Sequence, residues 1–405
     1  MVLEVDKRVI SIAAAVLGTV IFSGCSTREM VRVALEKDPG KAIKSLARSR
    51  VNAYKYDPEL VLSDIKRAQA EYNRMTGKLQ KESGKKWGKK EAGELPAKTR
   101  YVKYTEDYKN RVIVDFDQGT MVIEHLEDER VEEKLKGAVV TALMTPGDPR
   151  AVDLFSDKAI DLGGSPYLQG LIADQNDKLI NGREDAERFA DYLVSNKLQV
   201  RKINVNGESR NVRFVQIAMV NNHVEKKAAK FSPMVRKYSE ITAVSRSLIF
   251  AVMKTESGFN PFAVSSAPAF GLMQLVPASG GRDAYRKARG LDEPPTREYL
   301  FEPENNIELG STYLGVLIND SPLKDIDDPV SREYCAIAAY NTGAGNVFRA
   351  FSSGKASNRQ ADAIGRINSL KPDEVYTTLR TSLPYEETRS YIEKVVAAKK
   401  RYAAM

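Results

Sequence analysis

Apolar residues alternate in the middle of the chain and recur every three to four positions toward its end, and this change of period divides the sequence. Residues 101 to 225 combine strand-like alternation with helical spacing, whereas residues 226 to 405 have helical spacing throughout. Gly, Pro and Asn end the apolar runs of the second region. We therefore predict an α+β multidomain protein in which an all-α C-terminal domain of about 180 residues follows a smaller α+β domain.

Two β-hairpins are expected in the α+β region. The first pairs "NRVIVDF" with "TMVIEHL" across the turn "DQG", and the second, "LQVRKINVNGESRNVRFVQIAM", turns near Asn206-Gly207. The segments "DERVEEKLKGAVVTALM" and "REDAERFADYLVSN" lie between the hairpins and have helical spacing. No catalytic arrangement is recognisable in this region.

Residues 25 to 100 contain a helical part and a basic part. The segment "PELVLSDIKRAQAEYNRMTGKLQKE" has apolar residues at roughly helical spacing and predicts one amphipathic helix. Ser83 to Arg100 is rich in Gly, Lys and Ser without an apolar period, which predicts a linker or exposed loop. The alternative is contact of its Lys-Lys-Trp-Gly-Lys-Lys centre with an anionic surface.

Residues 1 to 24 are similar to a signal peptide. Lys7 and Arg8 precede the apolar run Val9 to Phe22, which is too short to span a bilayer comfortably. Small residues then precede Cys25, as in a bacterial lipoprotein signal, so we expect the Cys25 thiol to carry lipid. Ser26 is not acidic, which favours the outer membrane, with the protein facing the periplasm. The alternative is a buried N-terminal helix followed by an ordinary cysteine.

Composition narrows the chemistry. The chain has 405 residues, 42% of them apolar, which indicates two folded units. Its net charge of +8 indicates an anionic partner such as nucleic acid, lipid headgroups or an acidic polymer. Two cysteines and two histidines argue against Ser/His/Asp, Cys/His and zinc chemistry. His125 and His223 are interpreted as surface or structural residues, and Cys335 as a core residue. We expect no metal and no cofactor.

One carboxylate lies on an apolar helix stripe. The segment "SRSLIFAVMKTES" predicts a helix with Ser245 as its N-cap. Its stripe at i, i+3, i+4 and i+7 consists of Ile249, Val252, Met253 and Glu256. Desolvation there raises the pKa of a carboxyl, so that Glu256 could donate a proton near neutral pH. The alternative is a buried glutamate with a structural partner.

Further motifs follow Glu256 in a fixed order. Asn260-Pro261 is expected to stop the helix, and "GLMQ", "NIELGSTYL", "AAYNTGAGNV" and "ETRSYIEKV" come after it. Together with the Glu-Ser pair, they resemble the lytic transglycosylases with a soluble-lytic-transglycosylase (goose-lysozyme-like) domain. The lipoprotein signal and the middle α+β region are similar to the membrane-bound murein transglycosylase C subfamily. The resemblance implies a lysozyme-like helical domain over residues 226 to 405 and a cleft for peptidoglycan glycan strands.

The resemblance also implies roles for single residues. Glu256 corresponds to the catalytic glutamate of the family. The residues expected at the substrate are Ser265, Gln274, Tyr340, Asn341, Tyr391, Met273 and Ser257. Alternative roles are packing for Met273, a helix stop for Asn341 and a cap for Ser257.

The implied reaction needs one carboxyl. Glycosidases usually use two, but here only Glu256 falls in a motif, while Asp283, Asp292 and Glu293 lie in a polar loop. Glu256 would protonate the oxygen that links N-acetylmuramic acid to N-acetylglucosamine, and the 2-acetamido group would stabilise the oxocarbenium-like centre. Glu256 would then deprotonate the muramyl 6-hydroxyl, which closes a 1,6-anhydro ring without water.

Two alternatives stay open: a hydrolytic muramidase on the same fold, and a non-catalytic peptidoglycan-binding lipoprotein. Under either, the expected partners are glycan strands and, through the anchor, a membrane, with no nucleic acid. Every motif follows residue 226, so a fragment of residues 226 to 405 is expected to fold and cleave glycan. The sequence leaves open the oligomeric state and the choice between chain-end and internal cleavage.

Overall fold

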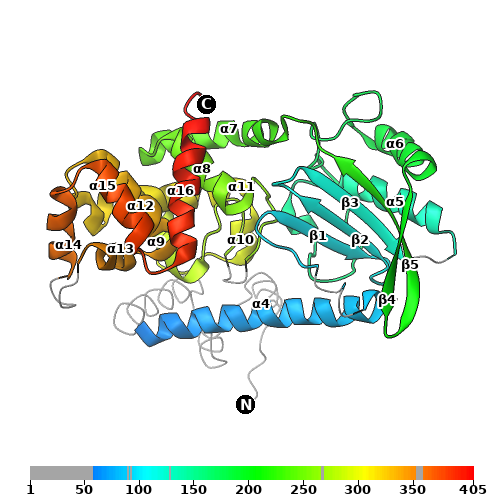
Figure 1. Ribbon diagram of the computed structural model, residues 1–405, viewed down its shortest axis with the longest axis horizontal. Helices are drawn as coiled ribbons and strands as arrows, with labels where there is room; N and C mark the ends of the chain where they lie inside the picture. Colours follow the sequence, from blue (N-terminus) through cyan, green and yellow to red (C-terminus); the bar gives the residue numbers. More distant parts are fainter. Residues whose placement is uncertain (1–57, 89–90, 92–93, 127–128, 266–268, 353–358) are drawn as a thin grey trace, which may run out of the picture.

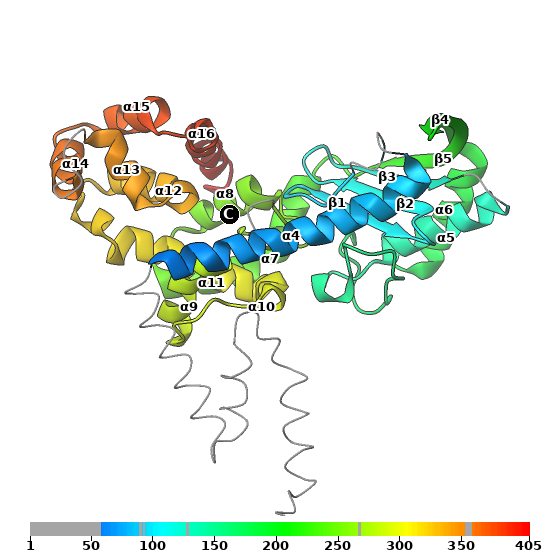
Figure 2. The ribbon, with the colours of Figure 1, turned by 90° about the horizontal axis from the view of Figure 1, so that it is seen from below.

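A computed structural model describes residues 58 to 405, except 89–90, 92–93, 127–128, 266–268 and 353–358. The predicted signal segment and Cys25 lie outside the described residues. A sheet with its helices forms one end of the molecule, and a bundle of helices forms the other (Figure 1). Helix α4 (Pro58–Trp87) runs along both ends (Figures 1 and 2).

Five antiparallel strands form one sheet in the order β1-β2-β3-β5-β4. Both predicted hairpins are confirmed, and β3 pairs with β5 to join them. The strands are β1 (Arg100–Thr105), β2 (Asn110–Asp115), β3 (Thr120–Leu126), β4 (Gln199–Val205) and β5 (Glu208–Ala218). The predicted turn at Asn206-Gly207 connects β4 and β5, and both residues have positive φ.

Strand β1 was not predicted because its sequence does not alternate. Its four central residues are all buried. Lys103 is among them, and its ammonium donates hydrogen bonds to the carbonyls of Asp153 at 2.8 Å and Ser156 at 2.7 Å. A buried, hydrogen-bonded lysine thus interrupts the apolar pattern that would have indicated a strand.

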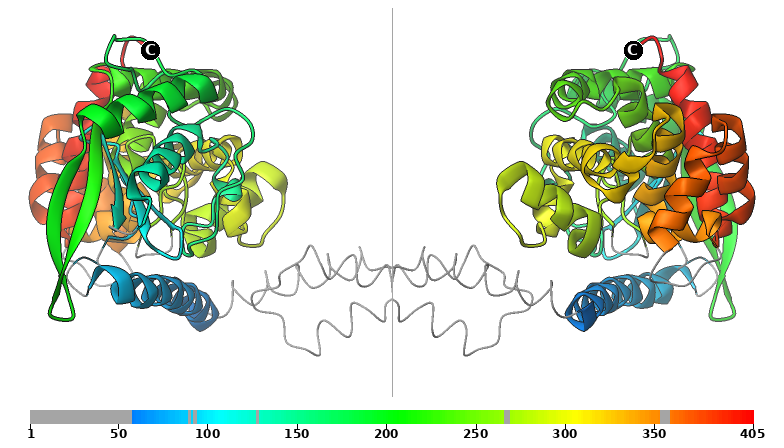
Figure 3. Two further views of the ribbon diagram at one scale, coloured as in Figure 1. Left: turned by 90° about the vertical axis from the view of Figure 1, so that its right-hand side faces the viewer. Right: turned by 90° about the vertical axis from the view of Figure 1, so that its left-hand side faces the viewer.

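Two helices and the end of α4 cover the sheet on opposite faces. Helices α5 (Val131–Met144) and α6 (Arg183–Asn196) form one core with residues such as Tyr101 and Met121. The second core contains Trp87, Tyr104 and residues of the β4–β5 hairpin, which extends toward α4 (Figure 3).

The predicted linker is wrong at its start. Helix α4 continues to Trp87, whose ring is fully buried and whose Nε1 donates to the Tyr108 carbonyl at 2.6 Å. The Arg111 guanidinium stacks 4.1 Å from the ring centroid. Long-range packing of one tryptophan therefore extends the helix into a segment that lacks an apolar period.

The second half of the chain is helical, as predicted. Among the described residues after 223, the only β structure consists of isolated bridges. Helices α9, α10 and α14 were not predicted, because they are short and rich in charge. The helices are α7 (His223–Thr242), α8 (Arg246–Ser257), α9 (Arg282–Arg289), α10 (Arg297–Phe301), α11 (Pro303–Gly315), α12 (Pro329–Thr342), α13 (Ala344–Phe351), α14 (Arg359–Asn368), α15 (Pro372–Ser382) and α16 (Glu386–Arg401). Shorter helical turns are η1 (Pro149–Ala151), η2 (Pro277–Gly281), η3 (Val316–Asp320) and η4 (Pro322–Asp325).

The loop after α8 fastens the two ends of the molecule together. Phe262 is fully buried within the core of the sheet unit, where its ring centroid lies 4.9 Å from that of Tyr101 and 5.2 Å from that of Tyr167. From α7, the ammonium of Lys227 donates to the Phe116 carbonyl at 2.5 Å. The helical unit therefore contributes a side chain to the core of its neighbour.

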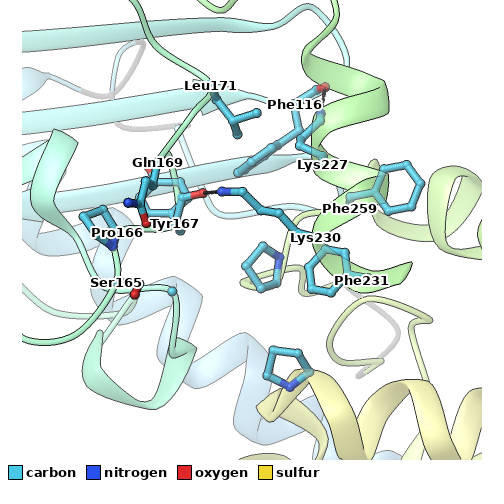
Figure 4. Close-up of a pocket in the computed structure, with 13 residues that line it drawn as sticks. Phe116, Ser165, Pro166, Tyr167, Gln169, Leu171, Lys227, Lys230, Phe231 and Phe259 are labelled. Atoms are coloured by element: carbon cyan, nitrogen blue, oxygen red, sulfur yellow. Dashed lines mark hydrogen bonds between the residues drawn. The ribbon is translucent and has the colours of Figure 1, made fainter. Parts of the chain in front are cut away.

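A cavity of about 330 Å³ lies at this junction, between the sheet unit and α7 (Figure 4). Phe116, Tyr167, Phe231 and Phe259 line it, and the Lys230 ammonium donates to the Tyr167 carbonyl at 2.9 Å. None of the residues predicted to form the active site lines this cavity.

Candidate active site

Helix α8 carries Glu256 one residue before its end. The Ser245 hydroxyl accepts a hydrogen bond from the Leu248 N–H at 3.3 Å, which confirms the predicted N-cap. The helix stops at Ser257 because Gly258 and Phe259 adopt the left-handed conformation, with φ of 59° and 64°. The stop was expected at Asn260-Pro261, and the left-handed pair ends the helix earlier.

Glu256 is buried, as its position on the apolar stripe predicts. Its side chain is only 5% exposed, and the Lys98 ammonium lies 3.4 Å from its Oε2. Burial raises the pKa of the Glu256 carboxyl above its ordinary value, while the positive charge of Lys98 acts in the opposite direction. The carboxyl is therefore placed to hold a proton at a pH at which an exposed glutamate is ionised.

Two tyrosines from different helices adjoin this carboxyl. Burial, and next the charge of Glu256, raise the pKa of Tyr340 on α12 and of Tyr391 on α16 well above the ordinary value. The Tyr340 hydroxyl donates to the Met273 carbonyl at 2.8 Å. Among the described residues, the buried Tyr391 hydroxyl has no hydrogen-bond partner of ordinary geometry, although it lies close enough to Glu256 for the negative charge of the carboxylate to raise the pKa of Tyr391.

The "GLMQ" motif forms a tight loop against α8. The Ser257 hydroxyl donates to the carbonyls of Met253 at 2.9 Å and Leu272 at 2.7 Å, so it joins the helix to the loop and does not cap the helix. The Gln274 amide donates to the carbonyls of Ala263 at 3.1 Å and Gly271 at 3.0 Å. Gln274 and Ser257 thus hold the loop that accepts the Tyr340 hydrogen bond.

The "NIELG" motif packs on the other side of this loop. Asn306 accepts from the Met273 N–H at 2.7 Å and donates to the carbonyls of Phe270 and Leu300, both at 2.8 Å. A Cβ on Gly310 would lie 2.3 Å from Met273 Sδ, so only glycine allows α11 to approach. Met273 itself is fully buried, and this geometry favours packing over contact with a substrate. Asn306 was within a recognised motif but was not singled out.

The structure also places Asn341 and Ser265, two further residues that were expected at the substrate. The Asn341 side chain accepts from the Thr388 hydroxyl at 2.7 Å, which joins the last turn of α12 to α16. Ser265 follows α8 in the loop that leads to the "GLMQ" motif, and its backbone N–H donates to the Ala269 carbonyl at 3.3 Å. Residues 266 to 268 lie outside the described residues.

Sequence reasoning missed Lys98. It lies two residues before β1, and its carbonyl accepts a hydrogen bond from the Asn260 amide at 3.1 Å. Its ammonium lies between Glu256 and Glu387 of α16, at 3.4 Å and 3.8 Å. A single lysine in a lysine-rich segment gives no sequence signal for a contact across 158 positions.

Comparison with known proteins identifies the family of this chain. Residues 64–230 match the model of the N-terminal domain of membrane-bound lytic murein transglycosylase C, and residues 233–363 match the transglycosylase SLT domain. The chain is 42% identical over 317 residues to proteins named membrane-bound lytic murein transglycosylase C from Yersinia pestis (strain Pestoides F) and Yersinia pseudotuberculosis serotype O:1b (strain IP 31758). The alignments cover 78% of this chain and 85% of each relative. The chain belongs to the membrane-bound lytic murein transglycosylase C family.

This match confirms the resemblance drawn from the motifs. A solved structure of an inactive mutant of lytic transglycosylase Slt from Pseudomonas aeruginosa is 25% identical, with a TM-score of 0.33, over 43% of this chain and 24% of that chain. In this member of the transglycosylase C family, no helix of the described residues is long and apolar enough to cross a membrane. Glu256, Tyr340 and the "GLMQ" loop all fall within the part that matches the SLT domain.

Proposed function

We propose that this protein is a peptidoglycan lytic transglycosylase that acts in cell wall remodelling and turnover. It would cleave the bond between N-acetylmuramic acid and N-acetylglucosamine without water and leave 1,6-anhydro-muramyl ends. The observation that carries the proposal is the Glu256 carboxyl, buried at the end of α8 beside Tyr340 and Tyr391, within the SLT part of a transglycosylase C family member.

Glu256 would act first as the acid. Burial favours its protonated form, and its proton would pass to the glycosidic oxygen as the bond between that oxygen and the muramyl anomeric carbon breaks. The carboxylate that forms lies 3.4 Å from the Lys98 ammonium, which stabilises the new negative charge. The substrate's 2-acetamido group would stabilise the positive charge at the anomeric carbon.

Glu256 would act next as the base. The muramyl 6-hydroxyl attacks the anomeric carbon, and its proton returns to the Glu256 carboxylate, which restores the enzyme. One carbon–oxygen bond has broken and another has formed within the substrate, so no water is consumed. A single carboxyl is therefore sufficient, and the second carboxylate of ordinary glycosidases has no task here.

Analysis of the products tests this reaction. Purified wall sacculi treated with the full-length protein should release fragments that end in anhydro-muramyl residues, lighter by one water than hydrolytic products and without a reducing end. Mass spectrometry before and after borohydride reduction distinguishes the two, because only reducing ends gain hydrogen. Reducing muramyl ends as the main product would make the protein a hydrolytic muramidase, and binding without any product would make it a wall-binding lipoprotein.

We further propose that a lipid on Cys25 holds the protein on the outer membrane, facing the periplasm. The name of its relatives includes "membrane-bound", and the sequence places small residues before Cys25. Cys25 lies outside the described residues, so the proposal rests on the sequence pattern and the family.

Replacement of this cysteine should release the protein. Cys25→Ala should move the protein from the membrane fraction to the soluble periplasmic fraction, because the thiol is the site of acylation. The matched control is Cys335→Ala, since Cys335 is buried in the helical core and should not affect fractionation. Retention of the Cys25→Ala protein in washed membranes would refute the lipid anchor.

A further inference from the structure

The Lys98 side chain connects the buried carboxyl to the surface. Glu256 is 5% exposed, Lys98 is 37% exposed and Glu387 is 78% exposed, so the three charges form a line from the interior outward. The ammonium lies between the two carboxylates and is closer to the buried one, at 3.4 Å against 3.8 Å. Lys98 belongs to the segment before the sheet, whereas both glutamates belong to the helical unit.

The backbone on both sides of Lys98 is fixed. The Ala97 N–H donates to the Arg100 carbonyl at 2.9 Å, and the Thr99 carbonyl accepts from the Phe116 N–H at 2.9 Å. The Lys98 carbonyl accepts from Asn260, four residues after Glu256. These bonds attach Lys98 both to the sheet and to the loop after α8, so its side chain leaves from a defined point.

We propose that Lys98 is a positioning residue for Glu256, so that the segment before the sheet completes the active site of the helical unit. The proposal rests on the proposed function, because it assigns Lys98 a task in the acid and base steps of Glu256. The ammonium would orient the carboxyl and set how readily it releases and regains its proton.

Four groups face Glu256 from three elements: Lys98 before β1, Tyr340 on α12, and Tyr391 and Glu387 on α16. The pKa of each tyrosine is raised well above 10, so neither ionises where a glutamate titrates. Lys98 and Glu387 act on the pKa of Glu256 in opposite directions, since the ammonium lowers it and the carboxylate raises it. The two charges can therefore be removed separately with opposite effects.

The experiment measures the initial rate of glycan cleavage by the full-length protein as a function of pH. Activity requires protonated Glu256 in the first step, so the rate falls as pH rises through its pKa. Lys98→Met removes the positive charge and should move this fall to higher pH, whereas Glu387→Gln removes the negative charge and should move it to lower pH. Lys98→Arg keeps the charge and should stay near the wild-type profile.

A second readout concerns orientation. On the low-pH plateau, where Glu256 is protonated in every variant, Lys98→Met should lower kcat by up to roughly 10²-fold with little change in KM, as expected when a reacting group is slightly misplaced. Lys98→Gln should behave in the same way. Circular dichroism should show that each variant is folded, which is expected because the Lys98 side chain is partly exposed.

The outcomes separate this proposal from the one on which it rests. A Lys98→Met profile that coincides with wild type, or that moves to lower pH, would overturn the positioning role and leave the wild-type products unchanged. Hydrolytic products, or no products, from the wild type would instead overturn the proposed function. Opposite shifts for Lys98→Met and Glu387→Gln support the positioning role.

Discussion

Glu256→Gln should reduce turnover by roughly 10²- to 10⁴-fold, as is typical for the loss of a group that transfers a proton in the transition state. Glutamine keeps the size and polarity of the side chain but carries no transferable proton. The carboxyl is nearly enclosed, so water cannot readily take its place. The rate should be measured on purified glycan under conditions in which the wild-type rate is linear.

Binding should survive this change. Sedimentation of the Glu256→Gln protein with sacculi should match that of the wild type, because the substitution leaves the surface and the fold intact. Glu393→Gln, which removes an exposed carboxylate from α16 and its ion pair with Arg380, is a suitable control and should retain full activity. If Glu256→Gln cleaved glycan at the wild-type rate, another group would have to be the acid.

Phe262→Ala should lower the free energy of unfolding by about 3–5 kcal/mol, the usual cost of removing a buried phenylalanine. The ring is fully buried among aromatic residues of the sheet unit although its backbone belongs to the loop after α8. Its loss should also loosen the loop that carries Asn260, and with it the contact to Lys98. Urea unfolding followed by fluorescence, together with the cleavage assay, measures both effects.

Ile241→Ala is the matched control for this prediction. Ile241 is a large apolar residue at the end of α7, but it is 67% exposed. Its truncation should change the free energy of unfolding by less than about 0.5 kcal/mol. If the two variants were equally stable, Phe262 would not fasten the two units together.

The elements that could be predicted are those marked by a pattern within their own residues, such as an apolar stripe or a turn sequence. The bounds of α6 and the start of α8 are as predicted, because an apolar stripe and, for α8, the Ser245 N-cap mark them. The β4–β5 hairpin was found from its Asn-Gly turn. The order of the motifs correctly indicated the family. The motif residues do not all adjoin Glu256, because Ser257, Met273 and Asn306 hold or form the loop that accepts the Tyr340 hydrogen bond.

Features that depend on distant contacts could not be predicted. Trp87 is buried only because a strand and a hairpin pack against it, and Lys98 meets Glu256 only after the two units have docked. The expectation that residues 226 to 405 act alone stays a prediction, and its test bears on these contacts, since that fragment would expose Phe262 and lack Lys98. The contact between Lys98 and Glu256 spans 158 positions, and the spacing of apolar residues along the chain does not indicate such a contact.

The order in which the chain is made gives the placement of α16 a further consequence. Glu256 lies well before the last helix, to which Tyr391 and Glu387 belong, and Lys98 precedes the sheet. A partly synthesised or truncated polypeptide therefore contains the acid without its surroundings. Such a chain would contain Glu256 without Tyr391 and Glu387, two of the groups that face it in the complete protein. We therefore expect chains that lack α16 to cleave glycan more slowly than the complete protein.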